Sequence, residues 1–130
     1  MISHLVDADR IIDYLNDRGG ARESMGTLIQ ARTLATSIIV VGELYEGLAG
    51  TASEAQKRSS LDELLAGLTV LGIDDDTASV FGRLRAELRV AGQLIADHDL
   101  WIATTALRHD LTLISRDAHL ERIANLKRVR

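Results

Sequence analysis

Residues 97–117, DHDLWIATTALRHDLTLISRD, contain a helix followed directly by a short buried strand. Acidic residues favour the first turn of a helix, and we expect this helix to cover residues 97–109. The apolar run at 111–115 then predicts a strand that ends just before Asp117. A helix and a strand that alternate without a tight hairpin signal are typical of an α/β protein with a parallel sheet.

The rest of the chain repeats this alternation. We expect further strands at 2–6, 33–35, 68–73 and 126–129, and helices between Asp7 and Gly19 and over 21–31, 36–48, 53–66 and 74–90. No proline or linker interrupts the chain, so residues 1–130 should form one domain. The predicted fold is a three-layer α/β structure with a mostly parallel sheet of four or five strands, flanked by helices. In such sheets, ligands bind at the carboxyl ends of the strands.

The composition is that of a globular protein. Hydrophobic residues make up 46% of the chain and charged residues 26%, and the absence of cysteine excludes disulfides, thiolate zinc sites and a cysteine nucleophile. Aromatic residues amount to only 3%, which disfavours a base-stacking platform. The N-terminus is unlike a secretion leader and no apolar run is long enough to span a membrane, so the cytoplasm is the expected location.

Four acidic residues lie beside segments that should be buried. Glu43 falls on the apolar face of the helix at 36–48, where a core residue is expected. Asp7 and Asp117 follow apolar strands, and Asp99 lies in the first turn of a helix. An unpaired buried carboxylate is costly, and carboxylates gathered from distant parts of a chain suit a hard cation such as Mg2+ or Mn2+. These residues indicate a metal-dependent enzyme.

Most of these acids also have a simpler explanation. Asp7 and Asp117 are placed to cap the helices that follow them, and Asp97 and Asp99 suit the positive end of a helix dipole. Asp9 is a natural helix cap as well as a candidate metal ligand. The separate explanations do not account for the convergence of the four acids Asp7, Glu43, Asp99 and Asp117.

Other acidic and histidine residues are weaker candidates. The run at 74–76 opens a helix and lacks the spacing and the glycine of a calcium loop. The histidines lack HExxH spacing, which disfavours a zinc site, although His98 stands between two acids. No GxSxG motif supports a serine hydrolase.

The acid-bearing segments resemble the motifs of the PIN-domain ribonucleases, and within them the VapC toxins of toxin–antitoxin pairs. HLVDADRIIDYL is similar to the first motif of the family, with Asp7 as its acid, and SIIVVGELYEGL is similar to the second, with Glu43. IADHDLWIATTALRHDLTLISRDAHLERI is similar to the third and fourth motifs together, which assign Asp99 and Asp117. The resemblance covers nearly the whole chain.

The chain departs from the family pattern after its first acid. The family commonly has Thr or Ser and then Asn at these positions, whereas this chain has Ala8 and Asp9. Ala8 removes a hydroxyl that could support the site through a hydrogen bond, and Asp9 adds a negative charge.

The resemblance implies endonucleolytic cleavage of RNA with the help of one or two Mg2+ or Mn2+ ions. Asp7, Glu43 and Asp99 would bind the metal directly or through water, and Asp117 would complete the site. Asp97 could bind a water of the outer coordination sphere.

Basic residues and protein partners are expected as well. Four arginines are candidates for contacts with the RNA backbone, namely Arg10, Arg85, Arg89 and Arg116. The resemblance implies a homodimer and a small antitoxin, and an arginine of the antitoxin would suit an acid-lined pocket. The helices at 21–31 and 53–66 carry apolar residues that could bind these partners or belong to the core.

Two other functions remain open from the sequence. Asp7-Ala8-Asp9 after a strand resembles the DxD motif of haloacid-dehalogenase phosphatases and phosphotransferases, although Ile11, Lys57 and Lys127 do not match that class. Alternatively, the acids hold a structural ion in a non-catalytic interaction module. Metal-dependent cleavage of RNA would distinguish an enzyme from such a module.

Overall fold

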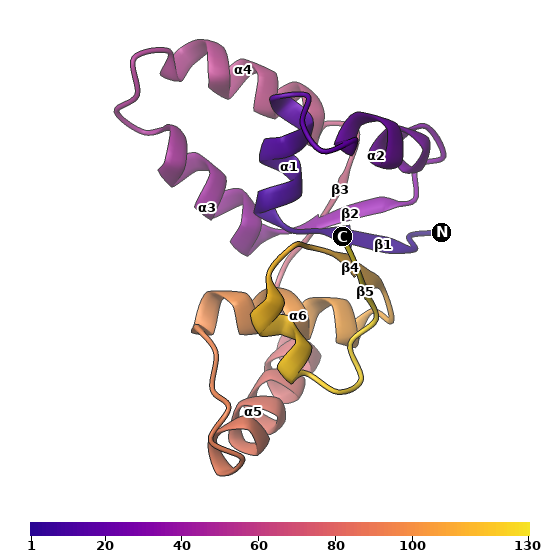
Figure 1. The fold of residues 1–130 in the computed structure, drawn as a ribbon, viewed down its shortest axis with the longest axis vertical. Helices are drawn as coiled ribbons and strands as arrows, with labels where there is room; N and C mark the ends of the chain where they lie inside the picture. The colour runs from indigo at the N-terminus through magenta and orange to yellow at the C-terminus, as the bar shows by residue number, and fades with distance from the viewer.

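The computed structural model describes all 130 residues and contains one sheet of five parallel strands (Figure 1). The strand order is β3-β2-β1-β4-β5. The strands are β1 (His4–Val6), β2 (Leu34–Ser37), β3 (Thr69–Leu71), β4 (Thr112–Ile114) and β5 (Arg128–Val129). The predicted parallel α/β sheet is therefore confirmed.

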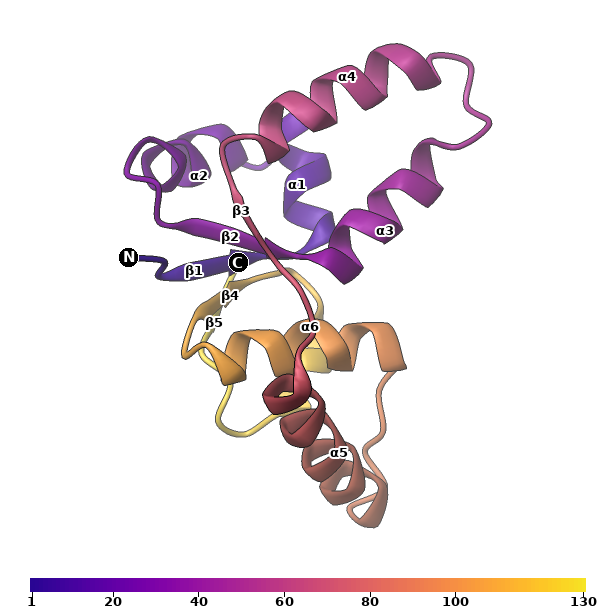
Figure 2. The same ribbon diagram turned by 180° about the vertical axis from the view of Figure 1, so that it is seen from behind.

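Helices cover both faces of the sheet. They are α1 (Ala8–Leu15), α2 (Ala21–Gln30), α3 (Ile38–Leu48), α4 (Glu54–Leu65), α5 (Asp75–Val90), α6 (Asp97–Arg108) and the 3-10 helix η1 (Ala118–Arg122). Figures 1 and 2 show α1 to α4 on one side of the sheet and α5 and α6 on the other, which gives the three predicted layers. None of the helices combines the length and the apolar character needed to cross a membrane.

The core is built around the central strand β1. Leu5 and Val6 have no exposed surface, and they belong to a cluster of 22 buried hydrophobic residues. Ile11 of α1 joins this cluster from one side of the sheet, and Leu100 and Ile102 of α6 join it as well. Because these side chains belong to the same core cluster as Leu5 and Val6, the core holds α1 and α6, whose first turns carry several of the acids.

The strand register aligns the carboxyl ends of the central strands. Val6 on β1 pairs with Thr36 on β2 and with Ile114 on β4. Asp7 and Ser115, the next residues along their strands, therefore leave the sheet side by side. This edge is where ligands bind in parallel α/β sheets.

All five strands differ slightly from their predicted bounds, and β2 and β3 differ the most. β3 is shorter than predicted, and because it is an edge strand its Val70 is 41% exposed. β2 extends beyond the predicted strand as far as Ser37, whose hydroxyl accepts a hydrogen bond from the Ile39 N–H and caps α3 as predicted. An apolar pattern locates the middle of such strands better than their ends, because hydrogen bonds with neighbouring strands decide where pairing stops.

Candidate active site

Ser115 connects the two acids that follow β1 and β4. Its hydroxyl donates a 2.8 Å hydrogen bond to Asp7 Oδ2 and accepts a 3.1 Å hydrogen bond from the Asp117 N–H. Ser115 has no exposed surface. The hydroxyl therefore fixes how the two strand ends, and the acids that they carry, are placed.

Asp7 is a helix cap as well as a member of this site. Its Oδ1 accepts a 2.7 Å hydrogen bond from the Ala8 N–H at the start of α1, so the capping role expected from its position is real. Burial raises the pKa of the Asp7 carboxyl above its ordinary value, although hydrogen bonds from Ser115 and Ala8 oppose the shift. The negative charges of Asp9 and Asp99 raise this pKa further.

Glu43 reaches the same site from the middle of α3. Val40, one turn earlier on α3, is fully buried in the core, and this face carries the Glu43 carboxylate inward. Glu43 Oε1 is buried and has no hydrogen-bond partner. Burial raises the pKa of Glu43, His98 opposes the shift, and the charges of Asp7 and Asp99 add to it.

Asp99 and Asp117 complete the group. Asp99 is half-buried in the first turn of α6, with Oδ1 3.3 Å from His98 Nε2. Burial raises the pKa of Asp99, repulsion from Asp117 and Asp9 adds to the shift, and His98 and His119 oppose it. Asp117 caps η1, because its Oδ1 accepts a 2.9 Å hydrogen bond from the His119 N–H.

The acid group, defined as Asp7, Glu43, Asp99 and Asp117 with the neighbouring Asp9, suits a divalent cation but is not a closed ligand shell. No three acidic or histidine side chains are placed to enclose an ion as they stand. Glu43 Oε1 and Asp9 Oδ1 are nonetheless buried without a hydrogen-bond partner. Mg2+ keeps several waters and needs only one or two carboxylates, so an open set of oxygen ligands fits it. A bound cation would also relieve the mutual repulsion of the acids.

Asp97 is engaged outside the acid group. Its side chain is 63% exposed, and its Oδ1 lies 3.0 Å from Nε of Arg85 on α5. Arg85, one of the arginines expected to contact RNA, is therefore already paired with a carboxylate. Arg89, on the same helix, is exposed.

Two other candidate arginines belong to an ion-pair network around Asp13. Arg10 is only 5% exposed, and its Nη1 donates a 2.7 Å hydrogen bond to Asp13 Oδ2. Arg116 donates from Nε to Asp13 Oδ2 at 3.0 Å and from Nη2 to Asp13 Oδ1 at 3.2 Å. The burial of Arg10 does not fit its expected contact with RNA.

Sequence patterns did not single out Asp13 and Ser115. Asp13 lies three residues after Arg10 and four after Asp9, so these residues share one side of α1. This spacing was the only sequence signal for an interaction of Asp13 with Arg10. Ser115 is a polar residue that ends a buried strand just before two charged residues, which is a weaker signal.

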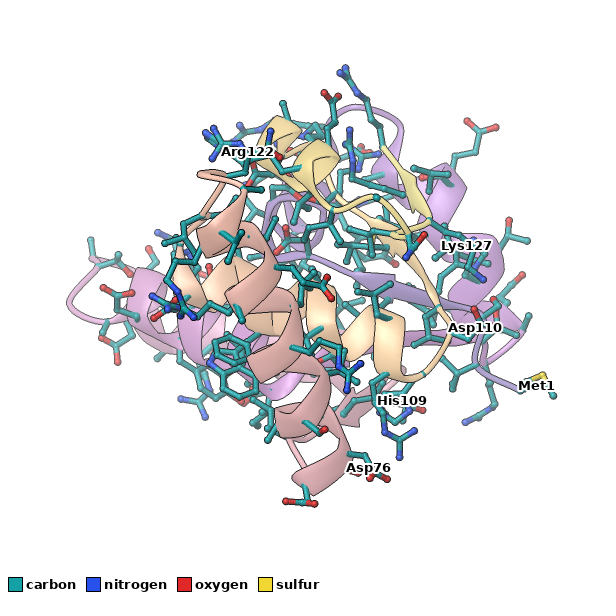
Figure 3. The ribbon with its side chains drawn as sticks, turned by 90° about the horizontal axis from the view of Figure 1, so that it is seen from below. Met1, Asp76, His109, Asp110, Arg122 and Lys127 are labelled. Atoms are coloured by element: carbon teal, nitrogen blue, oxygen red, sulfur yellow. The ribbon has the colours of Figure 1, made fainter.

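The acidic run at 74–76 lies far from the acid group. Arg108, the last residue of α6, pairs with Asp76 at 3.2 Å, and Asp76 and His109 lie at the same edge of the molecule in the view of Figure 3. Asp99 is in the first turn of the same helix, so about 13 Å of helix separates it from Arg108. The prediction that this run opens a helix is confirmed.

A groove of about 760 Å³ adjoins Glu43 between α1, α3 and α4. The apolar side chains that line the groove are Ile12, Leu15, Leu44, Leu48 and Leu61. Two basic residues, Arg18 and Lys57, also line it. Ile12 of α1 lines this groove and is 45% exposed.

Comparison with known families identifies a family to which this fold and its acid-lined edge belong. The family model described as "PIN domain" matches residues 4–126. The chain therefore belongs to the PIN-domain family. This membership contradicts the haloacid-dehalogenase alternative.

Similar proteins within that family are VapC ribonucleases. "Ribonuclease VapC2" of Rickettsia felis is 33% identical over 100 residues, which cover 76% of this chain and 75% of the relative. "Ribonuclease VapC2" of Haemophilus influenzae is 29% identical over 129 residues, or 98% of this chain and 96% of the relative. The crystal structure of VapBC2 from Rickettsia felis, bound to a DNA fragment from its promoter, contains a chain that matches with a TM-score of 0.89 and 27% identity, covering 99% and 98% of the two chains. The resemblance indicated by the four motifs is confirmed.

Proposed function

We propose that the chain is a Mg2+- or Mn2+-dependent endoribonuclease that acts as the toxin of a toxin–antitoxin pair. The observation that carries this proposal is the buried, unpartnered Glu43 Oε1, which shares a site with Asp7 and Asp99. A buried carboxylate oxygen without a partner is costly unless a cation or a proton satisfies it. The relatives named above are ribonucleases, which supports RNA as the substrate.

Asp7, Glu43 and Asp99 are the residues that we propose to hold the cation, directly or through water, with Asp117 beside them. When bound, the ion would lower the pKa of a water molecule and supply positive charge to the departing oxygen. The contribution of the chain is to orient the carboxylates. Hydrogen bonds from Ser115 and from the first N–H of α1 hold both oxygens of Asp7.

RNA binding at an acidic edge needs positive charge from elsewhere in the molecule. Arg89 is exposed on α5, and Arg85, on the same side of that helix, would have to exchange Asp97 for a phosphate. We therefore expect the bound cation and these arginines to counter the repulsion between the acids and the phosphate backbone.

Cleavage of a labelled single-stranded RNA tests the function. The purified chain should cut the RNA in Mn2+ or Mg2+, stop when a chelator is added, and resume when excess Mn2+ is restored. Cleavage that continues unchanged in the chelator would contradict a metal-dependent mechanism. A chain that binds Mn2+ but cuts no RNA would instead support the non-catalytic interaction module.

We propose the groove beside Glu43 as the binding site of the antitoxin. The apolar wall of the groove suits an amphipathic segment of the antitoxin. An arginine of that segment could pair with the acid group where the groove adjoins Glu43. The solved Rickettsia felis structure is of VapBC2, which supports a partner chain. Of the two helices expected to provide this surface, α4 lines the groove and α2 does not.

The antitoxin proposal is tested by co-expression with a candidate antitoxin, which would be encoded by a small reading frame adjacent to this gene. The two chains should co-purify, and growth arrest should be relieved. Ile12→Asp should weaken the complex because Ile12 lines the groove, whereas Val90→Asp, at an 87% exposed position on α5, should not. A complex that is unaffected by Ile12→Asp would contradict binding in the groove.

A homodimer could form at the β2–β3 side of the sheet. Ile38, Val70 and Ile73 are 47%, 41% and 38% exposed, and the pairing of Ser37 with Leu71 brings their segments together. We therefore propose this surface for dimer formation. Light scattering should give the mass of a dimer and Ile73→Asp should give a monomer; a monomeric parent chain at micromolar concentrations would contradict the dimer.

A further inference from the structure

The strand end that carries Asp117 is tied to α1 by ion pairs outside the acid group. Asp13 of α1 is only 6% exposed. Arg116 donates two hydrogen bonds to it, from Nε to Oδ2 at 3.0 Å and from Nη2 to Oδ1 at 3.2 Å. Such two-pronged contacts between arginine and a carboxylate fix geometry as well as supplying attraction.

Arg116 is also held through its main chain. Its N–H donates a 2.8 Å hydrogen bond to Asp9 Oδ2, so α1 binds both the backbone and the guanidinium of this residue. On either side of it, Ser115 donates to Asp7 and accepts from the Asp117 N–H. The three consecutive residues 115–117 are therefore fixed relative to the start of α1.

We propose that Asp13 and Arg116 are positioning residues that clamp the strand end after β4 onto α1, and that this clamp sets the affinity of the acid group for its cation. The inference rests on the proposed metal-dependent function. Neither side chain is assigned to the metal itself. Residues that support ligands in this way commonly alter metal affinity by about 10–100-fold when they are changed.

The clamp opposes the repulsion between the acids that it brings together. Asp7 and Asp9 lie at the start of α1, and Asp117 lies on the strand end that must approach them. Burial alone would raise the pKa of Asp13, but the hydrogen bonds and charges of Arg10 and Arg116 lower it overall. Asp13 therefore stays ionised and retains both partners.

Arg10 provides a matched control. It pairs with the same Asp13 oxygen as Arg116, but its other hydrogen bond goes to the Gly19 carbonyl, which is on the loop after α1. Arg10→Met would weaken the network without releasing residues 115–117. Arg116→Met would remove the two side-chain hydrogen bonds between the strand end and α1, while Asp13 keeps Arg10 and the Arg116 N–H keeps Asp9. The Arg116 side chain is 51% exposed, so this variant should fold.

Titration of the full chain with Mn2+, followed by the electron paramagnetic resonance signal of the free ion, tests the clamp. Arg116→Met should raise the Kd for Mn2+ about tenfold. Arg116→Lys keeps the charge but loses the two-pronged contact, so its Kd should lie between those of Arg116→Met and the parent. Arg10→Met should lower the melting temperature while its Kd stays close to the parent value. In RNA cleavage at a fixed, subsaturating Mn2+ concentration, Arg116→Met should lower kcat more than it raises the KM for RNA.

Equal Mn2+ affinity of Arg116→Met and the parent would overturn the clamp and leave the proposed nuclease intact. Equal weakening by Arg10→Met and Arg116→Met would also overturn it, because the effect would then follow from general loss of the network. A parent chain that does not bind Mn2+ would overturn the metal site itself.

Discussion

Ser115 Oγ lies 2.8 Å from Asp7 Oδ2, although the two residues are 108 positions apart in the chain. The same hydroxyl accepts the Asp117 N–H, so a single buried group joins the first and the last acids of the site. Neither the Asp7 carboxylate nor the Asp117 main chain could shift without breaking one of these hydrogen bonds. A substitution of Ser115 should therefore affect metal binding more than the stability of the fold.

Ser115→Ala should impair the site more than the fold. The change leaves Asp7 Oδ2 and the Asp117 N–H each without a partner, which should cost about 1–3 kcal/mol of stability. RNA cleavage at limiting Mn2+ should fall by about tenfold or more. Thr36→Val is the matched control, because it removes a buried 2.8 Å hydrogen bond to the Val6 carbonyl on the neighbouring strand. Equal losses of activity in the two variants would contradict the assigned role of Ser115.

The metal-free chain should lose stability as the pH rises. The pKa values of Asp7, Glu43 and Asp99 are raised above their ordinary values of 3.8, 4.5 and 3.8. A raised pKa means that the folded state binds the proton more tightly, so the stabilisation is present below the ordinary pKa and is lost as the pH rises through the raised one. The lowered pKa values of Asp13 and Asp74 act in the opposite direction, but only below about 3.8.

Thermal melts in a chelator, started near the ordinary pKa values at about pH 4 and carried up to about pH 8, measure this dependence. The melting temperature should fall across that range, and Glu43→Gln should reduce the fall. Added Mn2+ should raise the melting temperature more at the upper end of the range, because protons no longer compete for the carboxylates. A melting temperature that does not respond to Mn2+ at any pH would contradict a clustered metal site.

Asp97→Asn and Asp99→Asn should differ sharply although only one residue separates them. Asp97 is exposed and pairs with Arg85, so its loss should cost less than about 1 kcal/mol and leave cleavage nearly unchanged. Asp99 interacts with Asp7 and Glu43, and its loss should slow cleavage by more than the roughly 10–100-fold typical of supporting residues. A comparable loss in Asp97→Asn, measured on the same RNA, would place Asp97 in the site after all.

The strand ends and the acids at them could be predicted because one pattern carries both. An apolar run that stops at an acid, as before Asp7 and near Asp117, locates a strand and its carboxyl end at the same time. Parallel strands share that edge, so the acids had to meet there. Glu43 could be predicted for a different reason, since a charge on the apolar face of a helix conflicts with burial.

The ion pairs around Asp13 could not be predicted in the same way. Helical spacing shows that Arg10 and Asp13 share a face of α1, but it does not show what packs against that face. The contact with Arg116 depends on the register of β1 with β4, which local patterns do not encode. The exposure of Ile12 has a similar origin, because the divergence of α3 and α4 opens the groove beside it.

The most direct measurement is cleavage of a labelled RNA at saturating Mn2+ by the variants Asp7→Asn, Glu43→Gln and Asp99→Asn, each shown to be folded by circular dichroism. Each should cut the RNA about 100-fold more slowly than the parent or worse, because it removes a proposed ligand. Two controls remove a charge at exposed positions, Glu46→Gln on α3 and Asp75→Asn on α5, and should cut at the parent rate. If the three site variants cut as fast as the parent under these conditions, the acid group is not the active site.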